Sequence, residues 1–159
     1  MKVGIGYDIH RLVEGRALLL GGVEIPSDRG EEGFSDGDAL SHAVIDALLG
    51  PAGLGDIGSN FPPGDQRFRD ISSRTLVRKA REMCAQAGWA ILNIDCVVVL
   101  EAPRLLPHAE AIRARLAEDL GVSVGCITVK AKTKEGLDAT GARAAVEAYA
   151  VALIERTAE

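Results

Sequence analysis

Lys2-Val-Gly-Ile-Gly-Tyr-Asp-Ile-His10, near the start of the chain, carries the clearest structural signal in the sequence. Its apolar residues recur at every second position, which is the period of a β-strand. Asp8 and His10 would therefore lie on one face, together with Gly4 and Gly6. Because a glycine has no side chain, we expect these two positions to leave room for a ligand that approaches closely.

Turn residues and apolar periodicity divide the rest of the chain into strands and helices. We expect a glycine-turn hairpin over 17–25, followed by a loop over 26–33. Two further strands are expected over 91–101 and 126–132. Four helices are expected: one from Asp36 or Asp38 to about 49, one over 72–88, one through Ile112 to Gly121, and one over 140–156. The segment from 91 to 132 is then a strand–helix–strand unit, which crosses over right-handedly if its strands are parallel.

Residues 50–69 contain five glycines and three prolines, so we expect a long loop that could act as a lid. The pattern as a whole predicts an α+β protein (an α/β two-layer fold), with a mixed sheet and helices packed on one face. A length of 159 residues fits one domain, over 1–159.

Composition narrows the class of function. The net charge is −5 and no basic stripe stands out, which argues against nucleic acid as a general partner. The three cysteines are odd in number and lack the spacing of a metal site, as expected of free thiols in a reducing compartment. Neither a membrane span nor a leader is apparent, so we expect a cytoplasmic protein.

Two of the three histidines lie in segments that could form a metal site. Asp8 and His10 share a strand face, and His42 would approach from a helix. Two imidazoles and a carboxylate suit Zn²⁺ with its fourth position open, although surface or capping roles are the alternative. Asp46 lies one helical turn after His42 and could orient its ring by accepting a hydrogen bond from the nitrogen that does not bind the metal. The alternative for Asp46 is a solvated helix carboxylate.

Seven motifs in order along the chain are similar to those of one enzyme family. They are Gly6-Tyr-Asp8-Ile-His10, Ser35-Asp-Gly-Asp38 with His42, Asp46-Ala-Leu-Leu-Gly50, Leu54-Gly-Asp56-Ile-Gly58, Phe61-Pro62, Ala102-Pro103-Arg104-Leu-Leu-Pro107 and Val129-Lys-Ala-Lys132-Thr133-Lys-Glu135. Over essentially its whole length, the chain resembles the 2-C-methyl-D-erythritol 2,4-cyclodiphosphate synthases of the non-mevalonate isoprenoid pathway.

The resemblance implies a homotrimer with active sites between subunits and a small-molecule substrate, 4-diphosphocytidyl-2-C-methyl-D-erythritol 2-phosphate. Its 2-phosphate would attack the β-phosphorus and expel CMP. The resemblance also implies one zinc ion per subunit on Asp8, His10 and His42. Glu135 matches a contact to a second divalent ion, Mg²⁺ or Mn²⁺, that arrives with the substrate. Thr133 matches a hydroxyl that stabilises charge at phosphorus, and Lys132 could add a cation.

The substrate-binding residues also follow from the resemblance. The phosphate, ribose and methylerythritol contacts correspond to Asp8, Ile9, His10, Phe34, Ser35, Asp56, Ile57, Gly58, Phe61, Asp65, Lys132 and Thr133. The cytosine pocket corresponds to Leu100, Ala102, Pro103, Arg104, Leu105, Leu106 and Ala131. Without the resemblance, Ser35 would be a helix cap and residues 102–107 a proline-bounded connector.

Three positions depart from the family pattern. Phe34 stands where a histidine is usual, which removes a donor whose loss can cost about 10²–10³ in turnover. Pro63 removes one of two loop carboxylates and leaves Asp65. Ala142 replaces an arginine of the closing motif, and Arg143 is displaced by one position, which puts any anion or isoprenoid site along the trimer axis in doubt.

These departures motivate an alternative function, a low-activity homologue that binds cytidine nucleotides or isoprenoid phosphates. A further alternative is a metal-dependent phosphohydrolase that acts on diphosphates, with water as its nucleophile.

Overall fold

The computed structural model describes residues 1–157. A mixed five-stranded sheet has the order β4-β1-β7-β5-β6, and its strands are β1 (Lys2–Glu14), β4 (Arg29–Glu31), β5 (Trp89–Val99), β6 (Ile127–Lys132) and β7 (Ala145–Arg156). A separate hairpin pairs β2 (Leu18–Leu20) with β3 (Val23–Ile25). The helices are α1 (Ala39–Ala52), α2 (Ile57–Asn60), α3 (Ser73–Gln86), α4 (Ala109–Leu120) and α5 (Asp138–Gly141), and 3₁₀ turns cover Gln66–Phe68, Leu106–His108 and Val124–Cys126.

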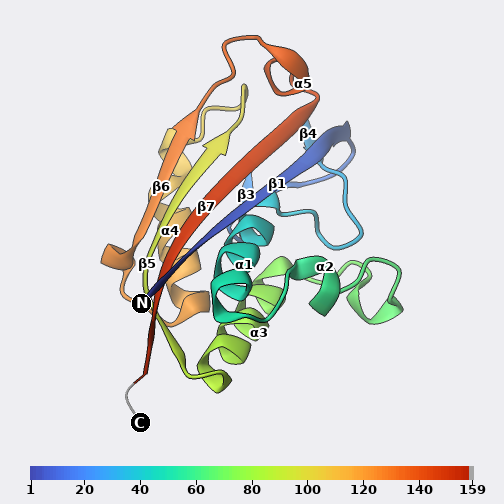
Figure 1. Ribbon diagram of the computed structural model, residues 1–159. Helices are drawn as coiled ribbons and strands as arrows, with labels where there is room; N and C mark the ends of the chain where they lie inside the picture. Colours follow the sequence, from blue (N-terminus) through green and yellow to red (C-terminus); the bar gives the residue numbers. More distant parts are fainter. Residues whose placement is uncertain (158–159) are drawn as a thin grey trace.

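The long helices α1, α3 and α4 all cover one face of the sheet (Figure 1). This arrangement confirms the predicted two-layer architecture. Strands β5 and β6 run parallel and are joined through α4, as the strand–helix–strand pattern indicated. Residues 50–69 are less irregular than expected, since they include the end of α1, all of α2 and a 3₁₀ turn.

The final segment was predicted as a helix, and that prediction is wrong. Residues 145–156 form β7, the central strand, which pairs antiparallel with β1 on one side and β5 on the other. Its alternate residues are fully buried: Val146, Ala148, Ala150, Ala152 and Ile154. Alanine favours helices by intrinsic propensity, but hydrogen bonding along both edges and burial of one face outweigh that preference.

Helix α1 lies unusually close to the sheet, and Gly4 and Gly6 are the reason. A Cβ at Gly4 would lie 2.1 Å from the Ala47 carbonyl oxygen, and one at Gly6 would lie 1.9 Å from that of Ala43. The face assigned to these glycines is correct, but the space is filled by the helix backbone and not by a ligand. Their effect on the site is therefore indirect, because they set how near α1 approaches β1.

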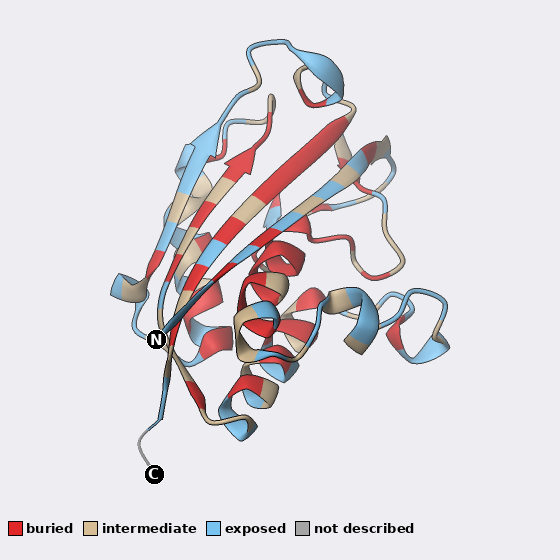
Figure 2. Cartoon of the chain, viewed as in Figure 1, coloured by how far each residue is buried: buried red, intermediate tan, exposed pale blue. Residues whose placement is uncertain are grey.

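Within residues 1–157, the opposite face of the sheet has no long helix over it and carries apolar side chains. Val3 is 67 % exposed and Ile5 is 72 % exposed, and Tyr7, Ile9 and Val151 are also exposed. Pale blue and tan positions alternate with red along β1 and β7 in Figure 2. A contiguous row of exposed apolar residues on paired strands is typical of a surface that another protein covers.

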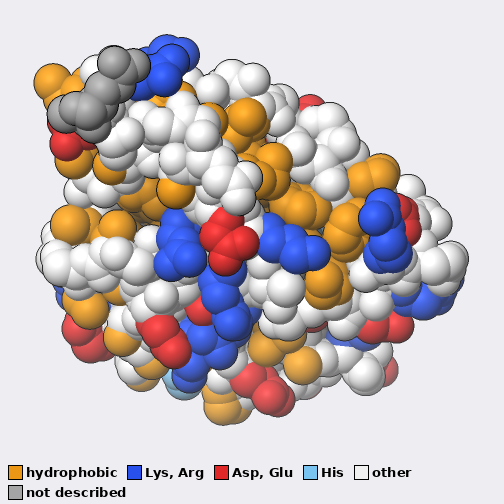
Figure 3. Space-filling model, turned by 90° about the horizontal axis from the view of Figure 1, so that it is seen from below, with side chains coloured by type: hydrophobic (Ala, Val, Ile, Leu, Met, Phe, Trp, Pro, Cys, Tyr) orange, Lys and Arg blue, Asp and Glu red, His pale blue; other side chains and the backbone are white. Residues whose placement is uncertain are grey.

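The surface seen from below mixes charges of both signs (Figure 3). Arg74 and Arg78, on α3, both pair with the buried Asp119 of α4. These ion pairs hold two helices together. Among the described residues, no helix has both the length and the apolar character that a membrane span requires.

Candidate metal centre

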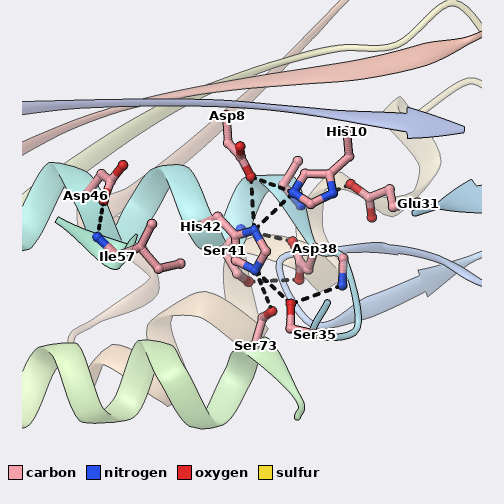
Figure 4. A network of polar contacts seen from close by, with 12 residues as sticks. Asp8, His10, Glu31, Ser35, Asp38, Ser41, His42, Asp46, Ile57 and Ser73 are labelled. Carbon is pink, nitrogen blue, oxygen red and sulfur yellow. Dashed lines mark hydrogen bonds and ion pairs between the residues drawn. The ribbon is translucent and has the colours of Figure 1, made fainter. Parts of the chain in front are cut away.

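Asp8, His10 and His42 converge on one point between β1 and α1 (Figure 4). Asp8 Oδ2 lies 2.8 Å from His10 Nε2 and 2.9 Å from His42 Nδ1, and the two ring nitrogens are 3.2 Å apart. The strand period places Asp8 and His10 on the same face, and α1 brings His42 beneath them one turn after its start. The structure thus brings together the three predicted metal ligands.

The geometry of this triad fits a small cation. Tetrahedral zinc bonds of 2.0–2.1 Å require ligand atoms about 3.3 Å apart, only a few tenths of an ångström more than these separations. Asp8, His10 and His42 would hold the ion. His10 and His42 also border a cavity of about 250 Å³, so a fourth position would face open space.

Hydrogen bonds leave the facing nitrogens of both rings free to bind a cation. His10 Nδ1 donates to the Glu32 carbonyl at 2.6 Å, so in the neutral ring Nε2 is the nitrogen without a proton. Ser73 Oγ donates to Asp36 Oδ1 at 2.5 Å and lies 2.9 Å from His42 Nε2, so it accepts a hydrogen bond from that ring. The proton of His42 is then on Nε2, and Nδ1 presents its lone pair to Asp8 and His10.

Sequence reasoning missed the contact of Ser73 with His42 and the support that Asp36 gives to Ser73. Ser73 is fully buried and lies 31 residues from His42, so no spacing rule connects the two. Ser35 Oγ also lies 3.1 Å from His42 Nε2, which gives Ser35 a supporting contact in addition to its predicted phosphate role.

The electrostatics of the triad favour a charged carboxylate. Burial raises the pKa of Asp8, but the imidazoles of His10 and His42 favour the ionised carboxylate, outweigh burial together and bring the pKa to about 2. Burial is the largest single effect on the pKa of His10 and lowers it, but the contacts of the ring with Asp8 and Glu32 together outweigh burial, and the net shift is upward. The carboxylate is therefore ionised at neutral pH, as a metal ligand must be.

Asp46 does not have the position predicted for it. Its Oδ1 accepts a hydrogen bond of 2.7 Å from the Ile57 backbone, whereas both ring nitrogens of His42 are engaged by Asp8, His10, Ser35 and Ser73. The i, i+4 spacing puts Asp46 on the correct side of α1, but its carboxylate accepts a hydrogen bond from the first residue of α2 and not from His42. Asp46 fixes the 54–60 segment and does not orient the histidine.

Several predicted substrate residues border the cavity beside the triad. Its lining is formed by His10, Phe34, Ser35, His42, Ile57, Gly58, Phe61, Pro63, Phe68 and Leu76. Asp56 is not part of this lining, and its side chain caps α2 directly before Ile57. Asp65 is paired with Arg67 at 2.6 Å, and the side chain of Ile9 lies on the opposite face of β1. Only the backbone of Ile9 can therefore border this site.

The predicted cytosine pocket is a separate hollow. Leu100, Glu101, Arg104, Leu105, Leu106, Ala131, Lys132 and Thr133 line a cavity of about 140 Å³. Ala102 and Pro103 lie in the same loop but outside that lining. Glu135 Oε1 contacts the Thr133 hydroxyl directly. This cavity shares no lining residue with the one at the triad, so the site residues fall into two groups within one chain.

The model of the YgbB family matches residues 1–155. The chain belongs to the YgbB family. Its relatives in this family include proteins named 2-C-methyl-D-erythritol 2,4-cyclodiphosphate synthase. The relative from Dechloromonas aromatica is 51% identical over 155 residues, which is 98% of this chain and 97% of the relative. The relative from Neisseria gonorrhoeae is 49% identical over 156 residues, 98% of each chain. The resemblance seen in the motifs is thereby confirmed.

Solved structures agree with the fold of this YgbB protein. A 2C-methyl-D-erythritol-2,4-cyclodiphosphate synthase bound to CDP superposes with a TM-score of 0.89 at 41% identity, covering 96% of this chain and 99% of the other. The bifunctional IspDF from Campylobacter jejuni gives a TM-score of 0.94 at 35% identity, over 98% of this chain and 42% of that one. IspF from Plasmodium falciparum in complex with CDP gives 0.86 at 31% identity, over 99% and 97%.

Proposed function

We propose that this protein converts 4-diphosphocytidyl-2-C-methyl-D-erythritol 2-phosphate to 2-C-methyl-D-erythritol 2,4-cyclodiphosphate and CMP, as a phosphorus–oxygen lyase that depends on zinc. The observation that carries the proposal is the convergence of Asp8, His10 and His42 in a chain whose relatives are cyclodiphosphate synthases over their full length. Three free cysteines fit a reducing compartment, for which we propose the cytoplasm.

For this reaction the protein mainly has to hold the reacting groups of the substrate in place, because the attacking and leaving groups belong to one molecule. A zinc ion on Asp8, His10 and His42 would supply Lewis acidity to the attacked phosphate. Ser35, 8 % exposed beside His42, can donate its hydroxyl to a phosphate oxygen.

The residues at and just after the end of β6 would bind the diphosphate of the substrate. Thr133 can donate to the oxygen that gains charge in the transition state, and Lys132 adds a positive charge on the same strand end. Glu135, in contact with Thr133, is placed to bind a second divalent ion, Mg²⁺ or Mn²⁺, that neutralises the α- and β-phosphates.

The two separate cavities support a homotrimer with active sites between subunits. One chain provides a metal group on β1 and α1 and a nucleotide group at the ends of β5 and β6, and the two share no lining residue. The exposed apolar row of Val3, Ile5 and Tyr7 offers the surface on which copies would pack. Active sites would then form where the metal group of one copy meets the nucleotide group of the next.

One observation favours the alternative of a low-activity homologue that binds cytidine nucleotides. Phe34 lines the cavity beside the triad, where it can neither donate a hydrogen bond nor carry charge. Arg69 lies over its ring at 5.4 Å, so the residue is also held in place.

Arg143, the displaced arginine of the closing motif, pairs with Asp28 at 2.8 Å. An isoprenoid-phosphate site there would first have to break this ion pair.

The test is direct product analysis. The purified protein is incubated with the diphosphocytidyl substrate and Mg²⁺, and products are followed by ³¹P NMR. We expect CMP and cyclic diphosphate in equal amounts, loss of both on chelation, and recovery when Zn²⁺ is added. His42→Ala should lose zinc and activity together, whereas His108→Ala, at the start of α4, should keep both.

Other products would decide between the alternatives. A linear phosphate product would indicate a phosphohydrolase. Tight CDP binding without CMP release, together with turnover gained in Phe34→His, would establish the low-activity homologue. Absence of CMP release with every divalent ion tried would refute the proposed reaction.

A further inference from the structure

The loop that carries Thr133 and Glu135 is fastened by the residue between them. Lys134 donates its backbone N–H to Glu101 Oε2 at 3.0 Å, and its Nζ lies 2.7 Å from Glu147 Oε1. Thr133 and Glu135 contact each other, whereas the intervening Lys134 bonds to Glu101 through its backbone and to Glu147 through its side chain. These two bonds fasten the loop at the residue between Thr133 and Glu135.

Glu147, which holds Lys134, is buried, and its carboxylate accepts three hydrogen bonds. It is 5 % exposed, and it accepts hydrogen bonds from Lys134, from Thr140 Oγ1 at 2.8 Å and from the Tyr149 hydroxyl at 3.0 Å. Burial alone would raise the pKa of Glu147, but these three bonds outweigh burial and lower it. The carboxylate is thus ionised and fixed at neutral pH.

The position of Glu147 in the sheet links this anchor to both groups of site residues. On the central strand β7, Glu147 pairs with Ile9 of β1, which lies between Asp8 and His10. On its other side, Glu147 pairs with Val99, the last residue of β5, which is followed by the predicted cytosine-pocket residues 100–106. The Tyr149 ring packs against Tyr7 at 4.8 Å, which adds a second contact between β7 and β1.

Stability alone does not account for such a pair. Glu147 is buried, and the side chain of Lys134 is 30 % exposed. An ion pair that is partly removed from water repays the cost of that removal only in part, and apolar residues of similar size often stabilise a fold as well. A charged pair does, however, impose one geometry on the loop, and that geometry determines the directions of Thr133 and Glu135.

We propose that Lys134 and Glu147 are positioning residues, which hold the 133–135 segment so that Thr133 and Glu135 face the phosphates of the substrate. The inference rests on the proposed function, since the phosphates come from that substrate. It adds two residues to the reaction that do not themselves touch the reacting atoms. Displacements near 1 Å can cost about 100-fold in rate, so a loosened loop should reduce kcat strongly.

The experiment compares Lys134→Gln, Glu147→Gln and the double variant with wild type. Lys130→Gln is the matched control, because Lys130 lies on the same strand β6 and pairs with Asp95 at the same 2.7 Å, outside the loop. Lys134→Arg tests whether a different cation restores function. Three quantities are measured in each protein: kcat and KM for CMP release, zinc content, and amide hydrogen exchange over 133–141 with CDP bound.

We expect kcat to fall by about 10- to 100-fold in either single variant. The double variant should be no worse than the singles, because all three lose the same contact. Zinc content should stay at wild-type level, exchange over 133–141 should accelerate, and Lys134→Arg should recover most of the rate. Lys130→Gln should match wild type in every measurement.

Loss of thermal stability with kcat within about twofold of wild type would show a purely structural ion pair and overturn the inference. Unchanged exchange over 133–141 would overturn it as well. If wild type releases no CMP, the proposed reaction fails, and the exchange data still decide whether Lys134 and Glu147 hold the loop.

Discussion

The hydrogen bond between Ser73 and His42 gives the most informative test of the metal centre. Ser73→Ala removes the hydroxyl that lies 2.9 Å from His42 Nε2 and donates to Asp36. Ser35 Oγ, at 3.1 Å, remains as the second partner, so the ring loses one of two contacts. The side chain is fully buried and alanine fits its volume, so we expect the fold to survive.

The expected loss of zinc affinity follows from this contact. A metal-bound imidazole donates more strongly than a free one, so the bond is stronger with the ion present. Loss of such a supporting contact weakens metal binding by about 10- to 100-fold. That factor corresponds to about 1.4–2.7 kcal/mol. We expect Ser73→Ala to lie at the lower end, because Ser35 stays.

Two further variants make the result specific. Asp46→Ala should leave zinc affinity unchanged, because Asp46 bonds to Ile57 and not to His42. Ser72→Ala is the matched control, since the adjacent Ser72 is exposed and makes no side-chain capping bond. Affinities are measured by competition with a chromophoric chelator at fixed pH. Wild-type affinity in Ser73→Ala, or a loss in Asp46→Ala, would refute the assignment of hydrogen bonds around His42.

Three further predictions concern other parts of the chain. Phe34→His should raise kcat for CMP release, by up to about 100-fold, because it would restore a hydrogen-bond donor beside the reacting phosphate. Unchanged turnover would show that other groups already compensate for the donor that Phe34 lacks. Glu31→Gln should stabilise the protein above pH 7: burial and the neighbouring Asp38 raise the pKa of Glu31 well above its ordinary value. Wild type thus loses stability as pH rises above the ordinary glutamate range, and this pH dependence should flatten in thermal melts of the variant. Gly6→Ala should cost about 1–3 kcal/mol in urea unfolding, since its Cβ would meet the Ala43 carbonyl at 1.9 Å; a smaller cost would mean that α1 can move away from the sheet.

The convergence of Asp8, His10 and His42 was predictable because local rules govern it. A strand period fixes Asp8 and His10 on one face, and a capped helix presents His42. The supporting contacts depend instead on which segments meet in space, so spacing alone selected Asp46 and could not indicate Ser73. Strand β7 was mistaken for a helix for a similar reason. Its alanines are small because α1 packs on them, and that constraint does not appear in the local sequence.

The apolar row on β1 and β7 also bears on how the protein reaches its working form. A single copy exposes Val3, Ile5 and Tyr7 to solvent, and in the proposed trimer other copies would cover them. On the proposed trimer, resistance to heat should then grow with protein concentration, since association removes the folded species from the unfolding equilibrium. If the trimer forms as proposed, scarce expression would leave single copies open to aggregation and to degradation, and activity would then depend on cellular abundance.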